Sequence, residues 1–137
     1  MQLRRLLPLL LLVSVTTLLF GVIGDGTWLN HVPERERVKV NPFDNDQYAI
    51  AAGAKLFRQN CASCHGEQGV GRDKKPNLHN DRVRGASAGE LQWLLTNGSM
   101  RNGMPSWSRL PEQQRWQIVS YLKSLEGNRE SQATAQK

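Results

Sequence analysis

The stretch NCASCHGEQGVGR, residues 60–72, decides how this chain folds, and it contains the only two cysteines of the 137-residue sequence. Cys61 and Cys64 are separated by two residues, and His65 follows directly. Side chains at positions i and i+3 of a helical turn lie on the same face. We therefore expect the two thiols and the imidazole to act together on one group.

Covalent attachment of haem is the chemistry that this spacing favours. The two thiols can add to the vinyl groups on one edge of a porphyrin, and the adjacent histidine can bind the iron. Cys-x-x-Cys-His is the recognised motif of this attachment. The sequence therefore predicts one haem c, bound through Cys61 and Cys64, with His65 as a metal ligand.

Three other interpretations of the motif are weaker. A thiol–disulfide redox pair needs a βαβ context, and the sequence predicts helices and no strand. A zinc site is disfavoured because Cys61, Cys64, His65 and His79 lack the paired spacing of structural zinc sites. A small disulfide between the two cysteines is the remaining structural alternative.

The N-terminus is typical of an exported protein. Arg4 and Arg5 precede an uncharged run, LLPLLLLVSVTTLLFGVI, at residues 6–23. A basic start followed by an apolar run predicts a signal peptide or a membrane anchor over 1–24, with the anchor slightly favoured. The rest of the chain is then expected on the periplasmic side of a bacterial inner membrane.

The charge of the exported part is mildly basic. It keeps 16 of the 18 Lys and Arg residues and all 12 Asp and Glu residues, so its net charge is 16 − 12 = +4. This charge is too small to predict nucleic-acid binding. It suits brief, electrostatically steered encounters with an acidic protein, or simply a soluble surface.

The exported part divides by composition into three segments. Residues 25–46 mix prolines with charges and show no sustained period, so we predict a tether. Residues 47–127 carry the helical patterns of a domain. Residues 128–137 have almost nothing to bury and are expected to form a flexible tail.

The predicted domain is all-α, with three or four short helices joined by long loops. Apolar residues at steps of three and four predict a helix over about 47–60. Ser87 and Glu90 have the spacing of a capping box at the start of a second helix. Pro111 is expected to open the last helix and Gly127 to close it. Such a small core usually needs a further stabilising element, which a haem would supply.

Five short motifs follow one another in the order of a known family. They are GAKLF (53–57), CASCH (61–65), PNLH (76–79), GMP (103–105) and RWQIVSYLKSL (115–125). With these motifs, residues 47–127 resemble a class I c-type cytochrome, the mono-haem, His/Met-ligated electron carriers. The resemblance implies a cytochrome c-like helical domain wrapped around one covalently attached haem.

The resemblance also implies roles for individual residues. The Pro76 carbonyl would orient the haem histidine, and Leu78 would pack on the porphyrin ring. Tyr121 in the last helix would pack against Gly53 in the first. Lys75 departs from the family, which commonly has glycine before this proline.

The second axial ligand has three candidates downstream of the motif: His79, Met100 and Met104. Met104 lies between Gly103 and Pro105, where glycine allows a close approach to the ring and proline stiffens the loop. It also matches the Met-Pro of the family, so we predict Met104, with Met100 as the runner-up. A methionine thioether raises the potential relative to a second histidine.

The resulting expectation is a periplasmic electron-transfer protein that is not itself an enzyme, although it can be the cytochrome subunit of a larger oxidoreductase. Its partners would be redox proteins, such as a dehydrogenase, an oxidase or a respiratory complex. The alternative is a haem-based gas sensor or a peroxidase-like enzyme, which would need a labile sixth ligand.

Overall fold

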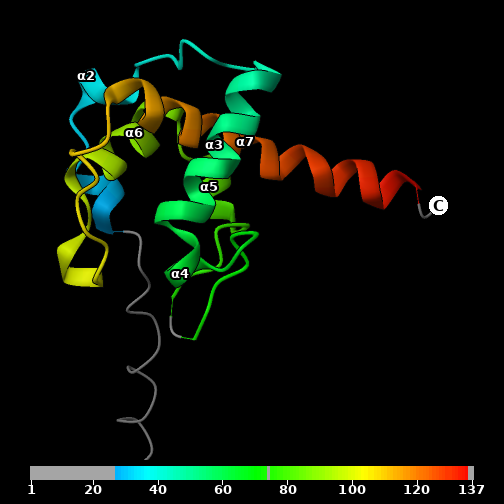
Figure 1. Ribbon diagram of the computed structural model, residues 1–137. Helices are drawn as coiled ribbons and strands as arrows, with labels where there is room; N and C mark the ends of the chain where they lie inside the picture. The colour runs from blue at the N-terminus through cyan, green and yellow to red at the C-terminus, as the bar shows by residue number, and fades with distance from the viewer. Residues whose placement is uncertain (1–26, 74, 136–137) are drawn as a thin grey trace, which may run out of the picture.

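The structure is a computed structural model that describes residues 27–73 and 75–135 (Figure 1). Within these residues there is no strand, only isolated bridges at Arg72–Lys75 and Ser99–Met104. The all-α prediction is therefore confirmed. The elements in chain order are η1 (Thr27–His31), α2 (Glu34–Arg37), α3 (Gln47–Asn60), α4 (Ala62–His65), α5 (Asp81–Gly85), α6 (Ala88–Asn97), η2 (Met100–Asn102) and α7 (Glu112–Ala135).

Helices α3 and α7 cross closely at the centre of the domain (Figure 1). A Cβ atom built on Gly53 would lie 1.9 Å from the carbonyl oxygen of Gln117 and 3.0 Å from the Cβ atom of Tyr121. Beside this contact, the rings of Phe57 and Tyr121 pack with centroids 5.2 Å apart. The predicted packing of Tyr121 against Gly53 is confirmed, because only a residue without a side chain lets the two backbones approach this far.

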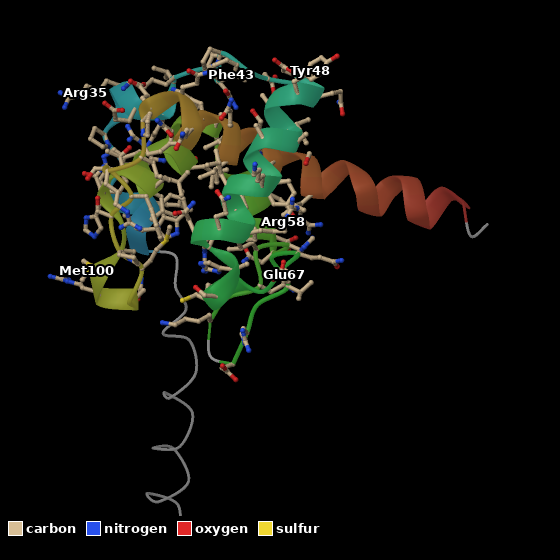
Figure 2. The ribbon with its side chains drawn as sticks, in the orientation of Figure 1. Arg35, Phe43, Tyr48, Arg58, Glu67 and Met100 are labelled. Atoms are coloured by element: carbon tan, nitrogen blue, oxygen red, sulfur yellow. The ribbon has the colours of Figure 1, made fainter. Side chains whose placement is uncertain are left out.

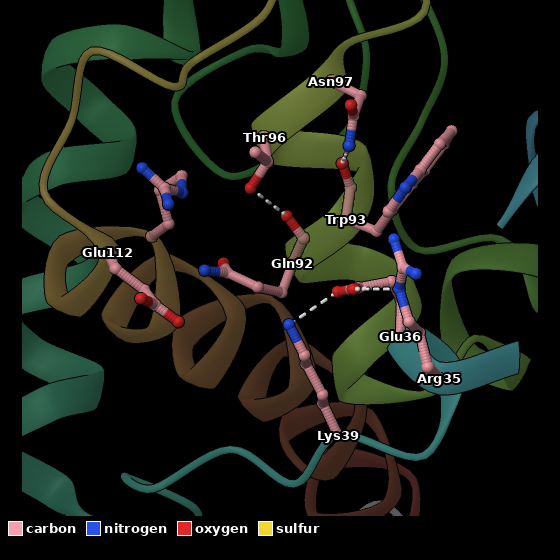
Figure 3. Close-up of a pocket in the computed structure, with 9 residues that line it drawn as sticks. Arg35, Glu36, Lys39, Gln92, Trp93, Thr96, Asn97 and Glu112 are labelled. Atoms are coloured by element: carbon pink, nitrogen blue, oxygen red, sulfur yellow. Dashed lines mark hydrogen bonds and ion pairs between the residues drawn. The ribbon is translucent and has the colours of Figure 1, made fainter. Parts of the chain in front are cut away.

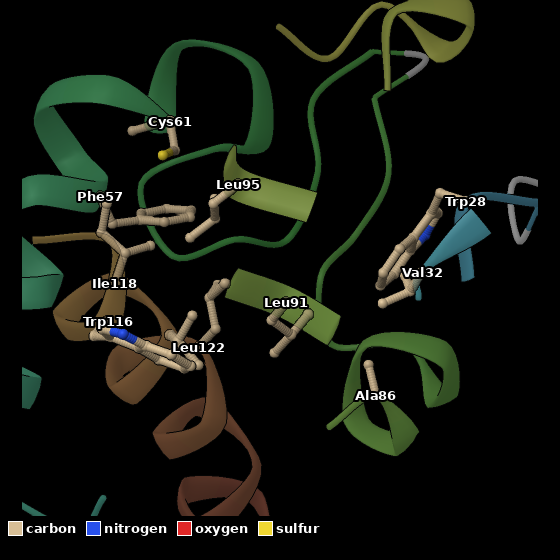
Figure 4. Packing of buried hydrophobic residues seen from close by; sticks show 12 residues of the cluster. Trp28, Val32, Phe57, Cys61, Ala86, Leu91, Leu95, Trp116, Ile118 and Leu122 are labelled. Carbon is tan, nitrogen blue, oxygen red and sulfur yellow. The ribbon is translucent and has the colours of Figure 1, made fainter. Parts of the chain in front are cut away.

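The hydrophobic core lies between α3, α6 and α7. Ser87 caps α6 by accepting from the backbone N–H of Glu90, and the Glu90 carboxylate accepts from the Ser87 N–H, so the predicted capping box is confirmed. Figure 4 shows the buried side chains of the cluster, among them Phe57, Leu91, Leu95, Trp116, Ile118 and Leu122.

The segment before α3 packs on the domain, contrary to the tether predicted for residues 25–46. In its described part, Trp28 and Val32 are only 8% and 5% exposed and belong to the core cluster. We call residues 27–46 the N-terminal strap. It crosses α6 at Gly89, where an added Cβ would lie 1.9 Å from the carbonyl oxygen of Glu36.

Side-chain hydrogen bonds fasten the strap at two further places. Arg37 binds the Glu90 carboxylate at the start of α6. Asn41, which is 5% exposed, donates to the carbonyl oxygen of Trp116 at 3.2 Å and to the hydroxyl of Ser120 at 2.9 Å. Both contacts join residues more than 50 positions apart, so no local sequence period could have indicated them.

Asn41→Ala should destabilise the folded protein by about 1–3 kcal/mol, because it leaves buried groups of Trp116 and Ser120 without this partner. The measurement is urea unfolding of the haem-loaded protein followed by circular dichroism. The control is Asn30→Ala, an exposed position of η1, for which we expect a change within about 0.5 kcal/mol. Equal midpoints for the two variants would show that the hydrogen bonds of Asn41 add nothing to stability.

The last helix is longer than predicted. Gly127 was expected to close it, but α7 continues to Ala135 and extends away from the domain (Figure 1). The residues beyond Gly127 include Arg, Glu, Gln and Ala, which favour helix, and a single glycine inside a helix costs only about 1 kcal/mol. The predicted flexible tail over 128–137 is therefore helical over its described part.

Membrane attachment concerns residues outside the described part of the chain. The predicted signal peptide or anchor over 1–24 falls there. In the residues that the structure describes, no helix has both the length and the apolar character needed to cross a bilayer.

Candidate functional site

One helical turn carries the three residues of the motif. Helix α3 ends at Asn60, Cys61 caps the next turn, and α4 ends at His65. Cys61 is 9% exposed and belongs to the core cluster, whereas Cys64 is exposed. The attachment motif thus spans the boundary between the core and the solvent.

The surroundings of the Cys61 thiol disfavour a redox role for the pair. Both cysteines are free. Burial, with a smaller contribution from Cys64, raises the pKa of the Cys61 thiol to about 11. A reactive dithiol needs a lowered pKa, because the thiolate is the nucleophile. Cys61 instead stays protonated near neutral pH, as expected of a thiol that no thiol exchange uses.

A zinc site is not assembled in the part of the chain that the structure describes, where no group of three or more His, Cys, Asp or Glu side chains converges.

The ring of His65 is oriented by the loop that follows it. Its Nδ1 atom lies 3.2 Å from the carbonyl oxygen of Pro76. A carbonyl oxygen can only accept, so Nδ1 carries the proton and Nε2 keeps a lone pair for a metal. A metal-binding histidine usually has such a partner on its other nitrogen. The residues present therefore fit a haem: His65 Nε2 would bind the iron, and the two cysteines would form thioether bonds.

The loop between His65 and Pro76 folds tightly, so that Leu78 returns to the core. The N–H of Leu78 donates to the carbonyl oxygen of Gly69 at 2.7 Å, and the half-buried Leu78 side chain packs against the core cluster. Lys75, the departure from the family pattern, is not among the residues with positive φ. The backbone there is one that any residue adopts, so the absence of glycine causes no strain.

The three candidates for a second ligand lie in different surroundings. Met104 is half-buried and packs against the core, whereas Met100 is 73% exposed on η2 (Figure 2). The Nε2 atom of His79 lies 2.8 Å from the carbonyl oxygen of Gln68 and is engaged there. Of the three, Met104 is the one whose side chain meets the core.

The backbone around Met104 is held by contacts that sequence reasoning missed. Ser99 and Met104 exchange two backbone hydrogen bonds, of 2.8 and 3.1 Å. Gly103, with φ of +74°, makes the turn between them. Gly98 is also tightly enclosed, since a Cβ there would lie 2.6 Å from the backbone nitrogen of Ser106. The sequence signals for this folded-back loop are the two glycines and Pro105.

A polar cavity of about 350 Å³ lies elsewhere, between α2, α6 and the start of α7 (Figure 3). Gln92 faces it and is 4% exposed, with its Oε1 atom lacking a protein partner. A buried amide oxygen of this kind is usually bonded to an ordered water. None of the predicted site residues lines this cavity; its walls are Arg35, Glu36, Lys39, Gln92, Trp93, Thr96, Asn97, Glu112 and Arg115.

Comparison with known proteins identifies a family for the domain. Residues 48–122 match the family described as cytochrome C oxidase, cbb3-type, subunit III. The cbb3-type cytochrome c oxidase subunit CcoP of Rubrivivax gelatinosus is 33% identical over 94 residues, which are 66% of this chain and 31% of that protein. Cytochrome c550 of Pseudomonas aeruginosa is 32% identical over 91 residues, 61% of each chain.

The fold also matches a solved structure. The crystal structure of cytochrome cL from Methylophaga aminisulfidivorans superimposes with a TM-score of 0.56 at 24% identity, covering 77% of this chain and 70% of that one. The predicted cytochrome c-like fold is thereby confirmed. The chain spans about a third of the length of the oxidase subunits that it matches.

Proposed function

The chain belongs to the family of cytochrome c oxidase, cbb3-type, subunit III, and from this premise we propose that it is an electron-transfer protein with one covalent haem c. The observation that carries the proposal is the contact of 3.2 Å between His65 Nδ1 and the Pro76 carbonyl, in the same helical turn as two free thiols. It leaves Nε2 available for iron beside both points of attachment.

The chain's own residues then have distinct tasks. Cys61 and Cys64 would form the thioether bonds to the haem, and His65 Nε2 and the Met104 sulfur would bind its iron. Leu78 supplies an apolar surface beside them. When bound, haem supplies an iron that cycles between Fe(II) and Fe(III). Because a thioether favours Fe(II), a His/Met pair would keep the potential above that of a bis-histidine site.

A redox partner would approach on the solvent side of the site. Cys64 is exposed, so the attachment edge is reachable there. Contacts between redox proteins are small and short-lived. The partners that we propose are an oxidase, a dehydrogenase or another respiratory complex, on the periplasmic side of a bacterial inner membrane. The similarity to oxidase subunits favours the first, and residues 6–23 would provide the anchor.

The rival function, a gas sensor or a peroxidase-like enzyme, requires an open or labile sixth position with a polar group nearby. His79 is the candidate for that group, but its ring is engaged with the Gln68 carbonyl. Rapid binding of carbon monoxide by the reduced wild-type protein would favour the rival.

Met104→Ala should abolish the weak far-red band of the oxidised protein that arises from sulfur–iron ligation, and it should lower the reduction potential. Met100→Ala is the matched control, because this exposed methionine lies in the same loop. We expect its spectrum to equal that of the wild type. Persistence of the band in Met104→Ala, or its loss in Met100→Ala, would refute the assignment of Met104.

A further inference from the structure

Hydrogen bonds tie the chain just after His65 to the segment 76–79. Besides the contact of His65 with Pro76, the Leu78 N–H donates to the Gly69 carbonyl at 2.7 Å. The third bond joins the Nε2 atom of the His79 ring to the Gln68 carbonyl at 2.8 Å. The segment that orients the proposed ligand is thus itself held in place by a histidine side chain.

His79 is fixed at both ends. Its backbone N–H donates to the side-chain oxygen of Asn77 at 2.8 Å. Its ring must donate to Gln68, because a carbonyl oxygen can only accept. A half-buried ring held in this way restrains where residues 76–79 lie relative to Gln68.

We infer that His79 is a positioning residue for His65: its bond to Gln68 keeps the Pro76 carbonyl within reach of the His65 Nδ1 proton. This inference rests on the proposed function. Outer partners of a metal-binding histidine fix its orientation and raise its basicity as a ligand. A more basic imidazole stabilises Fe(III) more than Fe(II), so the bond from His79 lowers the reduction potential of the site.

Removing the ring's donor should therefore raise the potential. In His79→Ala the segment 76–79 can move away from His65, and the Nδ1 hydrogen bond weakens. At a fixed applied potential, we expect the ratio of oxidised to reduced protein to fall several-fold, and at most about tenfold. A tenfold change in a one-electron couple is about 59 mV.

The test compares reduction potentials of the haem-loaded full-length chain. His79→Gln is the conservative variant, because its amide N–H can still donate to the Gln68 carbonyl, and it should restore a potential close to that of the wild type. His31→Ala is the control for loss of a histidine, since this exposed residue lies in the strap. A second readout is hydrogen exchange of the His65 ring N–H by NMR, which should be faster in His79→Ala alone.

Each outcome decides the inference. A higher potential with faster ring exchange in His79→Ala, reversed in His79→Gln, supports it. A folded His79→Ala protein with wild-type potential overturns it, as do equal shifts in both variants. If His79→Ala loses its haem, the potential of His79→Phe is compared with that of His79→Gln instead. The phenylalanine keeps a ring of similar size but has no N–H to donate. If the wild-type protein carries no covalent haem, the proposed function itself is refuted.

Discussion

Replacement of both Cys61 and Cys64 by alanine should yield a protein without covalent haem and with little helical circular dichroism. A haem that buries several hundred Å² would contribute on the order of 10 kcal/mol, at roughly 25 cal/mol per Å². A helical domain of this size has only a few kcal/mol of its own to lose. Cys61 is part of the core, so the attached group would lie against the packed side chains.

Intact mass and far-ultraviolet circular dichroism measure the two effects separately. Ser63→Ala is the matched control, because Ser63 is exposed and lies between the two cysteines, and it should keep both the haem and the helices. A double cysteine variant with the full helical signal would show that the domain folds without its attached group. The mass of the wild-type protein also shows whether residues 1–24 are removed on export.

Gly53→Ala should destabilise the protein by at least about 3 kcal/mol, at the upper end of the effects of overpacking. The new Cβ would lie 1.9 Å from the carbonyl oxygen of Gln117 and 2.6 Å from its carbonyl carbon. Both atoms are backbone, so no side-chain rotation relieves the clash. Helices α3 and α7 have to separate, which also weakens the packing of Phe57 on Tyr121.

The control for this variant is Gly85→Ala at the end of α5. A Cβ there meets nothing within 4 Å, so we expect little change or a gain of up to about 1 kcal/mol from helix propensity. Chemical unfolding of the two haem-loaded variants gives the comparison. A midpoint for Gly53→Ala within error of that for Gly85→Ala would contradict the close crossing.

Features that depend on short stretches of chain were predictable. The apolar period at 47–60 predicted α3 with its observed bounds, and Ser87 with Glu90 predicted the capping box of α6. The motif at Cys61, Cys64 and His65 needed only its spacing to indicate haem. The two helix predictions are confirmed because helix periodicity and capping act over three or four residues.

Features that depend on distant contacts were not predictable. Residues 27–46 have no period, yet Trp28 and Val32 belong to the core cluster and α2 contacts α6. Gly89 resembles any glycine near the start of a helix, and only the fold places Glu36 against it. Likewise, only the fold of the loop places the Gln68 carbonyl beside the ring of His79.

The amino-acid order by itself thus determined the helical class of the protein and the family that it resembles. It also predicted the residues that would attach a haem. The tertiary structure alone decided that the N-terminal strap is part of the domain and which groups surround Met104 and His79. The reason is physical: reactive side chains and helix signals are set by near neighbours, whereas burial and hydrogen-bond partners are set by segments that meet only when the chain is packed.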